Sequence, residues 1–327
     1  MANDERQHSA NRPVWDEASL ERVHQVPDKA RRVQAMFDAI VPRYELVNTL
    51  TTLGLDGTWR RRLVRAMELP QGARVLDIAC GTGQVVRAFQ KYRQEVAGIC
   101  GVDFSAEMVR EANRLEEERY GGGSAGSGSR CQTGVRSTPY APGTLAPGTQ
   151  VERQHGQPAP SIQLIAPADR GIRALGAPAN RAGVAPGWFA QGDAQYLPFE
   201  DKSFDAVTCV FGVRNFAEPQ AGLAEMFRVL RPGGMVGILE FSMPRVAVLA
   251  GLYKVYFRAV LPRLASCLSG DRGGAYHYLQ KSVESFCRQV DLRERLRQCG
   301  FAQVQVRPLT FGVVCLYMAV RPMGEQV

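Results

Sequence analysis

The sequence is poor in the features that mark metal, redox and membrane-spanning proteins. None of its eight cysteines forms a Cys-x-x-Cys pair and its four histidines lie far apart, so no zinc, redox or histidine-based metal site is predicted. Met1–Pro13 lacks the apolar core of a signal peptide. The longest apolar run, Val246–Tyr253, is too short to span a bilayer. We therefore expect a cytoplasmic protein with reduced, buried cysteines and no bound metal.

The formal net charge of +8 bears on partners rather than on fold. Residues 121–187 contribute a net +4 of this excess, and the Arg31-Arg32 and Arg60-Arg61-Arg62 clusters add more. No nucleic-acid-binding motif accompanies the charge, so no nucleic-acid partner is expected. An anionic membrane surface is the favoured partner, which predicts peripheral membrane contact on the cytoplasmic face.

Composition divides the chain into three kinds of segment. Residues 1–27 are predicted to be a disordered tail, and residues 28–120 and 188–322 to form a single domain. Residues 121–187 open with GGGSAGSGS, are rich in Pro, Gly and Ala, and show no sustained period. Such a composition buries too little apolar surface to offset chain entropy, so we interpret this segment as a low-complexity insertion, a long flexible loop.

Strand and helix patterns alternate through the predicted domain. Apolar runs typical of strands and periodic segments typical of helices take turns, with strands at 74–79, 96–102, 204–211 and 235–241 and helices at 84–92, 106–118 and 217–230. This alternation predicts an α/β fold with a mostly parallel sheet and helices on both faces. Helical segments between 29 and 67 are expected to form an N-terminal cap. A helix at 292–299 and strands at 302–307 and 311–320 are expected to end the domain.

A ligand-binding loop is predicted after the first strand. Asp77 lies at the end of a buried strand, and Gly81, Thr82 and Gly83 follow it in a tight loop before a helix. Glycine lets a ligand approach the backbone closely. A dinucleotide fingerprint would need a third glycine where the chain has Val86, so a nicotinamide dehydrogenase is disfavoured.

Three further features narrow this interpretation. Asp103, 20 residues past Gly83, ends the second strand, where a carboxylate can accept hydrogen bonds from two ribose hydroxyls. Asp193, followed by Ala194, begins the next unit and could accept a bond from an adenine amino group. A Leu-Arg-Pro-Gly-Gly turn at 230–234 precedes a strand that ends in Glu-Phe. This ordered set resembles the class I (Rossmann-like) methyltransferases, which implies S-adenosylmethionine as the cofactor.

The resemblance extends to the UbiE/MenG family of quinone-ring C-methyltransferases. Similar to that family are Phe37–Tyr44, Phe211-Gly212-Val213-Arg214-Asn215, Leu239–Ser242 and Ala275–Leu279. The Leu-Thr-Phe-Gly sequence at 309–312 is most like the bacterial menaquinone members. The resemblance covers about Lys29–Glu117 and Trp188–Pro322, and leaves out the tail and the insertion.

The chain departs from the family at a few positions near the expected site. Cys80 stands where many members have Gly, and Val210 stands where several have a Ser that contacts the cofactor through its side chain. Any contact of Val210 would therefore be apolar or through its backbone. Glu45 and Thr49 replace two usual Asp residues.

The resemblance implies an enzyme that transfers a methyl group from S-adenosylmethionine to a ring carbon of a prenylated quinol, most closely demethylmenaquinol to menaquinol. Ring methylation in ubiquinone biosynthesis, or methylation of another small lipophilic substrate, stays open. So does a protein that keeps the fold without activity, although Asp77, Gly81, Gly83 and Asp103 argue against it. The oligomeric state is left open.

Catalytic residues are expected at the carboxyl end of the strand that ends at 211. Arg214 could stabilise a phenolate or form a structural ion pair, and Asn215 could orient a hydroxyl or cap a helix. Tyr44 could cover or hydrogen-bond the substrate, or be a core aromatic. His277 is a weaker candidate for the base. An apolar stripe between 249 and 261 could hold a prenyl tail or pack in the core.

Overall fold

The computed structural model describes residues 28–93, 95–120, 187–244 and 275–324, together with residues 15, 20, 23, 26, 251 and 255. Its described strands are β1 (Ala73–Ile78), β2 (Val96–Asp103), β3 (Gly187–Gln191), β4 (Phe204–Val210), β5 (Leu230–Phe241), β6 (Ala302–Leu309) and β7 (Val314–Val320). Its longer helices are α3 (Lys29–Ile40), α4 (Tyr44–Thr51), α5 (Asp56–Ala66), α6 (Gln84–Tyr92), α7 (Ala106–Tyr120), α9 (Pro219–Val229), α12 (Ala275–Gln289) and α13 (Leu292–Gln298).

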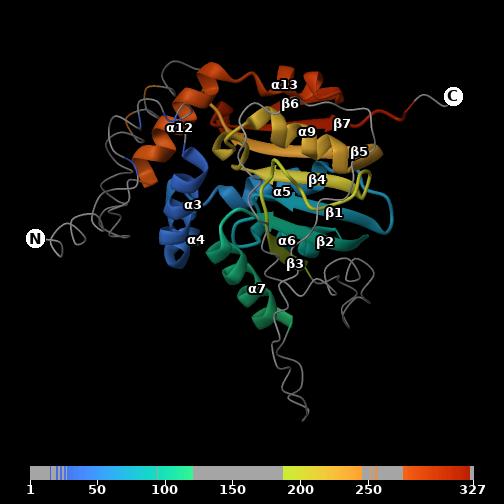
Figure 1. Ribbon diagram of the computed structural model, residues 1–327, viewed down its shortest axis with the longest axis horizontal. Coiled ribbons are helices and arrows are strands. Elements are labelled where there is room, and N and C mark those ends of the chain that lie inside the picture. Colours follow the sequence, from blue (N-terminus) through green and yellow to red (C-terminus); the bar gives the residue numbers. More distant parts are fainter. Residues whose placement is uncertain are drawn as a thin grey trace, which may run out of the picture.

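The strands form one seven-stranded sheet in the order β3-β2-β1-β4-β5-β7-β6 (Figure 1). The first five pair in parallel, whereas β7 runs antiparallel between β5 and β6. The predicted α/β class with a mostly parallel sheet is confirmed. From β1 the chain adds β2 and β3 on one side of the sheet and β4 and β5 on the other. The boundary between β1 and β4 is therefore a topological switch point, where a crevice opens at the carboxyl ends of the strands.

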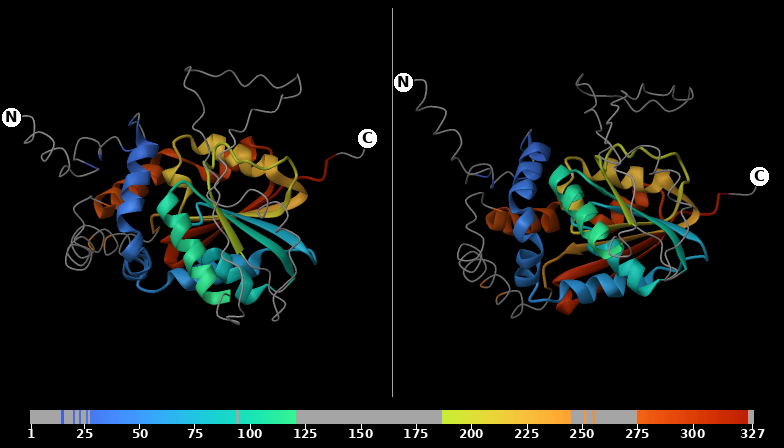
Figure 2. Two further views of the ribbon diagram at one scale, coloured as in Figure 1. Left: turned by 60° about the horizontal axis from the view of Figure 1, so that its bottom comes forward. Right: turned by 90° about the horizontal axis from the view of Figure 1, so that it is seen from below.

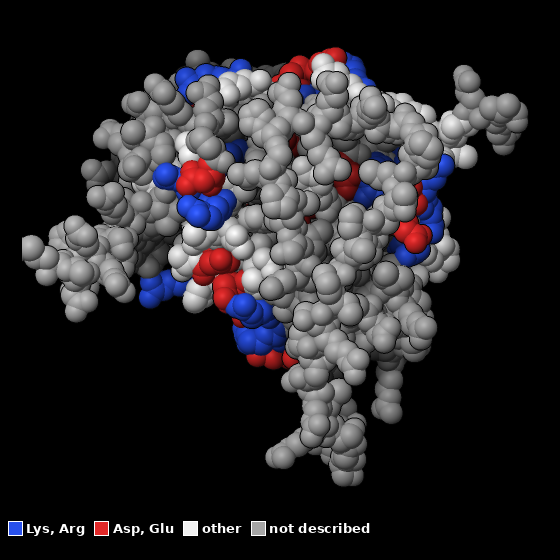
Figure 3. Space-filling model, in the orientation of Figure 1, with Lys and Arg blue, Asp and Glu red and all other residues white. Residues whose placement is uncertain are grey.

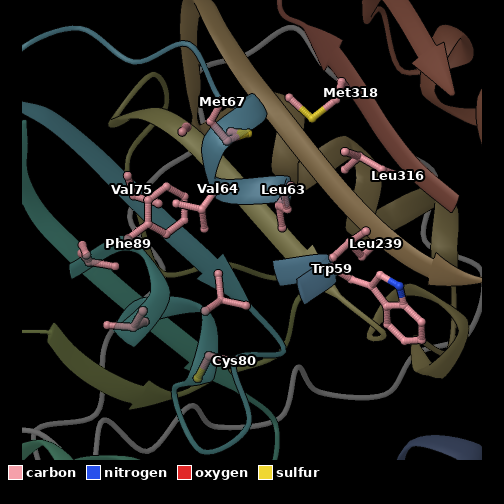
Figure 4. Packing of buried hydrophobic residues seen from close by; sticks show 14 of the residues in the cluster. Trp59, Leu63, Val64, Met67, Val75, Cys80, Phe89, Leu239, Leu316 and Met318 are labelled. Carbon is pink, nitrogen blue, oxygen red and sulfur yellow. The ribbon is translucent and has the colours of Figure 1, made fainter. Parts of the chain in front are cut away.

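The central strands are buried on both faces because their side chains alternate between two cores. Val75 of β1 packs with α5 and α6 on one face, and Leu76 packs with α9 and α13 on the other. Figure 4 shows the first core, in which Leu63 and Val64 of α5, and Met67 just after it, lie against the sheet. The expected placement of helices on both faces is therefore confirmed.

Two helices from opposite parts of the chain meet at one end of the sheet (Figures 1 and 2). Val33 and Met36 of α3 pack with Tyr278 of α12 in a third, smaller core. The expected N-terminal cap is thus formed by α3 and α4, whereas α5 belongs to the layer that covers a sheet face. Among the described residues, no helix has both the length and the apolar character needed to cross a membrane.

Some boundaries differ from the sequence predictions. The sequence did not predict β3, because this strand has only five residues and the polar Gly192-Asp193 pair follows it directly. The strand predicted to begin at 311 begins at Val314, because Phe311 has φ 57° and cannot continue an extended strand. Most of the predicted tail and of the insertion lies outside the described residues, but Trp15 and Val23, which the sequence placed in the disordered tail, are buried in the third core with Tyr278.

The two ends of the predicted insertion are held together by one side chain. Glu116, near the end of α7, accepts hydrogen bonds from the backbone N–H of Gly187 at 2.7 Å and from Gln90 at 2.5 Å. Gly187 begins β3. The chain therefore leaves and re-enters the domain at neighbouring points.

Candidate active site

A cleft lies where four neighbouring parallel strands end. The residues that follow β3, β2, β1 and β4 line it, and α3 and Tyr44 close it from the other side. The space between its lining atoms, with the open mouth included, is about 760 Å³. Of the residues predicted from the sequence, those that line the cleft are Tyr44, Gly81, Asp103, Asp193, Ala194, Val210 and Asn215.

The loop after β1 is shaped by left-handed backbone. Gly81 and Gly83 have φ of 54° and 85°, which glycine adopts without steric cost. A Cβ on Gly83 would lie 2.6 Å from the ring of Phe189, so no other residue fits there. The backbone N–H of Gly81 donates to Asp103 at 2.8 Å, which ties this loop to the end of β2. The loop is therefore a preformed, close approach of backbone to the cleft.

Asp103 has acceptor capacity left on both carboxylate oxygens. Oδ2 accepts from the N–H of Gly81 at 2.8 Å, and Oδ1 accepts from the N–H of Ser105 at 2.9 Å. Burial raises the pKa of this carboxyl to about 6, against the effect of the backbone N–H groups of Ser105, Gly81 and Phe104, and the nearby charge of Asp38 adds to the rise. Each oxygen of a carboxylate can accept two bonds, so a pair of vicinal hydroxyls in the cleft can be bound by the ionised form.

Asp77 is buried and keeps one oxygen without a hydrogen-bond partner. Thr208 donates to Oδ1 at 2.7 Å, whereas Oδ2 has no partner among the described residues. Burial raises the pKa of Asp77 to about 7, and the nearby charge of Arg60 opposes that rise. A buried acceptor without a donor is costly, so this oxygen is suited to a cationic group of a ligand.

The loop after β3 is held by its own side chains. Oδ1 of Asp193 accepts from the backbone N–H and from the side-chain amide of Gln195, at 2.9 and 3.0 Å. The amide oxygen of Gln195 in turn accepts from the N–H of Glu218 at 2.8 Å. Asp193 and Ala194 thus line the cleft from a loop that is fastened to the start of α9.

Tyr44 and the loop after β1 are in contact across the cleft. A Cβ on Gly81 would lie 3.4 Å from the Tyr44 ring, and Phe37 packs edge-on against that ring with centroids 6.2 Å apart. Burial raises the pKa of the Tyr44 hydroxyl, while the nearby Asn48 amide and the charges of Arg60 and Arg214 oppose the rise. Tyr44 therefore offers a neutral hydroxyl and an aromatic wall rather than a base.

Thr82 faces away from the cleft, contrary to its predicted place among the cofactor contacts. Its hydroxyl donates to Oε1 of Glu45 at 3.0 Å, and Arg87 binds the same oxygen at 2.6 Å. Glu45, which the sequence marked only as a departure, therefore links α4 to the glycine loop. Asp77, Thr82 and Gly83 are not among the residues that line the cleft.

Asn215 is positioned by two partners at the end of β4. Its Oδ1 accepts from the hydroxyl of Tyr278 at 3.0 Å, and its Nδ2 donates to the carbonyl of Phe211 at 3.3 Å. Phe211 has φ 58°, so the chain turns sharply there and exposes its backbone to the cleft. The neighbour of Tyr278, His277, is exposed and does not line the cleft.

Arg214 lies beneath the cleft in a buried ion pair. Its Nη1 contacts Oε1 of Glu240 at 2.8 Å, and both side chains are almost wholly buried. The same nitrogen donates to the carbonyl of Phe211, and the guanidinium lies 5.4 Å from the centroid of the Phe241 ring. The structure therefore places Arg214 in the ion pair that the sequence left as the alternative to a phenolate contact.

Lys29 is a residue of the site that sequence reasoning missed. Its Nζ donates to the carbonyls of Arg214 and Phe216, at 3.0 and 2.6 Å, on either side of Asn215. Burial and then the charge of Arg214 lower its pKa to about 8. Because these partners lie about 185 residues away along the chain, no local pattern could reveal this contact.

The remaining predictions concern the cysteines, metal binding and the apolar stripe between residues 249 and 261. The six cysteines within the described ranges carry free thiols, and no group of acidic, His and Cys side chains there could hold a metal ion. The stripe proposed for a prenyl tail lies almost entirely outside the described residues.

Comparison with known proteins gives consistent matches over most of the chain. The sequence model of the ubiE/COQ5 methyltransferase family matches residues 25–121 and 177–321. A demethylmenaquinone methyltransferase of Deinococcus radiodurans is 34% identical over 291 residues, which cover 89% of this chain and 93% of the relative. A ubiquinone/menaquinone biosynthesis C-methyltransferase of Geobacter sulfurreducens is 32% identical over 90% of both chains. A demethylmenaquinone methyltransferase of Thermus thermophilus is 33% identical over 88% of this chain and its own full length.

Proposed function

Because the chain belongs to the ubiE/COQ5 methyltransferase family, we propose that it transfers a methyl group from S-adenosylmethionine to a ring carbon of a prenylated quinol, demethylmenaquinol, to give menaquinol. The observation that carries the cofactor assignment is the arrangement of Asp103, Asp193 and the Gly81 loop around one cleft. Relatives named for the demethylmenaquinone reaction support the substrate assignment.

Two residues that line the cleft, and Asp77 next to the lining residue Ile78, fit this cofactor at three points. Asp103 offers one free acceptor site on each oxygen to the two ribose hydroxyls. Asp193 lies on the adjacent loop, in reach of the adenine end. The unpartnered Oδ2 of Asp77 suits the amino group of the methionyl end, because a cation there compensates a buried carboxylate. When bound, S-adenosylmethionine supplies an electrophilic methyl group.

The protein's task is then to hold the quinol ring in line and to favour its ionised form. Tyr44 and Phe211 provide aromatic walls, and Asn215 is fixed at the end of β4 where the ring must meet the methyl donor. We propose that Asn215 orients the ring hydroxyl. Tyr44 keeps its own proton, so it is not the base that ionises the quinol. As the new carbon–carbon bond forms, the bond from the methyl group to sulfur breaks and S-adenosylhomocysteine leaves. The methylated ring carbon then loses its hydrogen as a proton, which restores the aromatic ring.

Arg214 acts in this proposal as a positioning residue. It binds the carbonyl of Phe211 and the carboxylate of Glu240, and so sets the turn that carries Asn215. Its charge also lowers the pKa of Tyr44 against the larger effect of burial, so a positive potential reaches the cleft. A potential of that sign favours a phenolate, the nucleophilic form of the ring.

The direct test incubates the purified chain with S-adenosylmethionine carrying a deuterated methyl group and reduced demethylmenaquinone. Mass spectrometry of the extracted quinone should show one labelled methyl on the ring. Parallel reactions contain the methoxylated prenyl benzoquinol of ubiquinone biosynthesis, which the name of the Geobacter relative also suggests, and a lipophilic phenol. Faster labelling of either alternative would overturn the menaquinol assignment. Calorimetry without any quinol checks the cofactor site separately.

A further inference from the structure

Two large apolar side chains protrude into solvent from strained backbone. Leu53 is 71% exposed with φ 51°, and Phe311 is 76% exposed with φ 57°. For residues with a Cβ this left-handed conformation is sterically unfavourable, and turns normally place Gly or Asn there. Neither side chain is buried in the core, so packing does not explain why apolar residues occupy these two strained positions.

The two protruding turns are fastened to each other. Leu53 and Leu55 lie in the turn that leads into α5, and the N–H of Trp59, one turn into that helix, donates to the carbonyl of Leu55 at 3.1 Å. The indole N–H of Trp59 donates to the hydroxyl of Thr310, next to Phe311, at 2.8 Å. Leu53, Leu55 and Phe311 therefore form one feature, called here the apolar edge.

The apolar edge lies at the same end of the sheet as the cleft. Phe311 precedes β7, whose first residue, Val314, pairs with the last residue of β5, Phe241. Trp59 packs edge-on against Phe241 and against Phe211, with centroids 6.5 and 6.1 Å apart, and Phe211 lines the cleft. Trp59 and Phe211 therefore connect the apolar edge to the proposed quinol site through ring contacts.

Unpaired positive charge lies on α5, the helix that begins next to Leu55 of the apolar edge. Arg61 and Arg62 are exposed on α5 and form no ion pair with any described residue, whereas Arg60 is buried against Asp56. The other arginine cluster noted in the sequence, at 31 and 32, is paired with Asp28. In Figure 3 basic and acidic side chains lie intermingled, as on α7, where salt bridges pair arginines with glutamates.

We propose that the apolar edge, with Arg61 and Arg62 of α5, docks the protein on an anionic lipid bilayer. A few protruding apolar side chains suffice to enter the boundary between headgroups and acyl chains, and adjacent arginines attract anionic lipids. Three side chains are too few for a stable protein interface, which buries over about 1,000 Å². Membrane binding is inferred from the exposed side chains alone. Its purpose, access to a quinol dissolved in the bilayer, rests on the proposed function.

The test is sedimentation of the full chain with vesicles in the absence of cofactor and quinol. Vesicles of phosphatidylcholine with phosphatidylglycerol should bind the protein, pure phosphatidylcholine should bind it much less, and added salt should weaken the binding. The variant Leu53→Asn with Phe311→Asn should bind at least about tenfold more weakly, because two apolar anchors are removed. Its melting temperature should hold or rise, since Asn tolerates the left-handed backbone. The matched control is Met323→Asn, which removes an equally exposed apolar side chain that packs near Gly233, at the opposite end of the sheet.

The electrostatic half has its own pair of variants. Arg61→Gln with Arg62→Gln should weaken binding to anionic vesicles about thirtyfold, because each basic side chain near such a surface contributes about fivefold. Arg293→Gln with Arg297→Gln removes the same charge from α13, which covers the other face of the sheet, and should have little effect. Equal losses in the test and control variants would overturn the proposal.

Two further outcomes are decisive. Failure of the wild-type chain to bind anionic vesicles would overturn the proposal, and so would a dimer that is lost in the Leu53→Asn, Phe311→Asn variant. Turnover of a water-soluble, short-tailed quinol separates this inference from the proposed function. That turnover should be unchanged in the edge variants, whereas turnover of quinol embedded in vesicles should fall. No turnover of any quinol by the wild type would refute the function and leave the binding result standing.

Discussion

Replacing Asp103 by Ala should weaken S-adenosylmethionine binding about tenfold to a hundredfold. Both carboxylate oxygens already accept one backbone N–H, from Gly81 and Ser105, so each has one site left for a ribose hydroxyl. Hydrogen bonds to a charged group contribute roughly 1.5–3 kcal/mol, which corresponds to that range of affinity. Asp201→Ala, which removes an exposed carboxylate paired with Arg228, is the control.

The pH dependence of binding makes this prediction sharper. Only the ionised carboxylate accepts both hydroxyls, and the pKa of Asp103 is raised to about 6. Affinity should therefore be fully present above that pH and fall as pH drops through it, by up to about tenfold per unit. Asp77, with a pKa raised to about 7, adds a separate decline at higher pH.

Calorimetric titration between pH 5 and 8 gives the affinity and its pH profile together. The wild type should show both declines, and Asp103→Ala should keep only the one near pH 7. The ligand-free protein should show the opposite trend in stability, because a carboxyl with a raised pKa favours the folded state at low pH and loses that contribution as pH rises toward 7. Unchanged affinity in a folded Asp103→Ala protein, or an unchanged profile, would refute this assignment.

Three further predictions concern the rest of the domain. Arg214→Ala should lower the free energy of unfolding by about 3–5 kcal/mol, because Glu240 is left buried without its partner. Arg214→Met with Glu240→Leu should regain most of the melting temperature. If Arg214 positions Asn215, turnover per folded molecule of this double variant should stay below that of the wild type. Lys29→Met should lower the melting temperature, since two carbonyls lose their donor. Its lowered pKa means that wild-type stability should rise relative to Lys29→Met between about pH 8 and 10.5, where the unfolded chain binds the extra proton. Replacing residues 122–185 by a short Gly/Ser linker should leave the melting temperature and cofactor affinity nearly unchanged, because Glu116 joins the two ends; a large drop would show that the segment packs on the domain.

The sequence by itself determined the fold class and several of the residues that line the cleft. Asp77, Gly81, Gly83 and Asp103 could be selected because their meaning is local. A strand must end, a loop must turn through left-handed backbone, and a carboxylate at the next strand end then lies beside it. The carboxyl ends of neighbouring parallel strands meet at one edge of the sheet, so Asp193 and Asn215 could also be expected there.

Only the tertiary structure decided which side chains face the cleft and which are occupied elsewhere. Arg214 meets Glu240, Thr82 meets Glu45, Lys29 binds carbonyls across the domain, and Trp59 is tied to Thr310, 251 residues away. Packing of the apolar core brings certain polar groups into the interior. Buried polar groups need hydrogen-bond partners, so they pair with whichever groups the fold places next to them. Residue type and local periodicity do not tell which residues distant in the sequence come into contact. For this reason the contacts of Lys29 and the apolar edge could be recognised only in the folded chain.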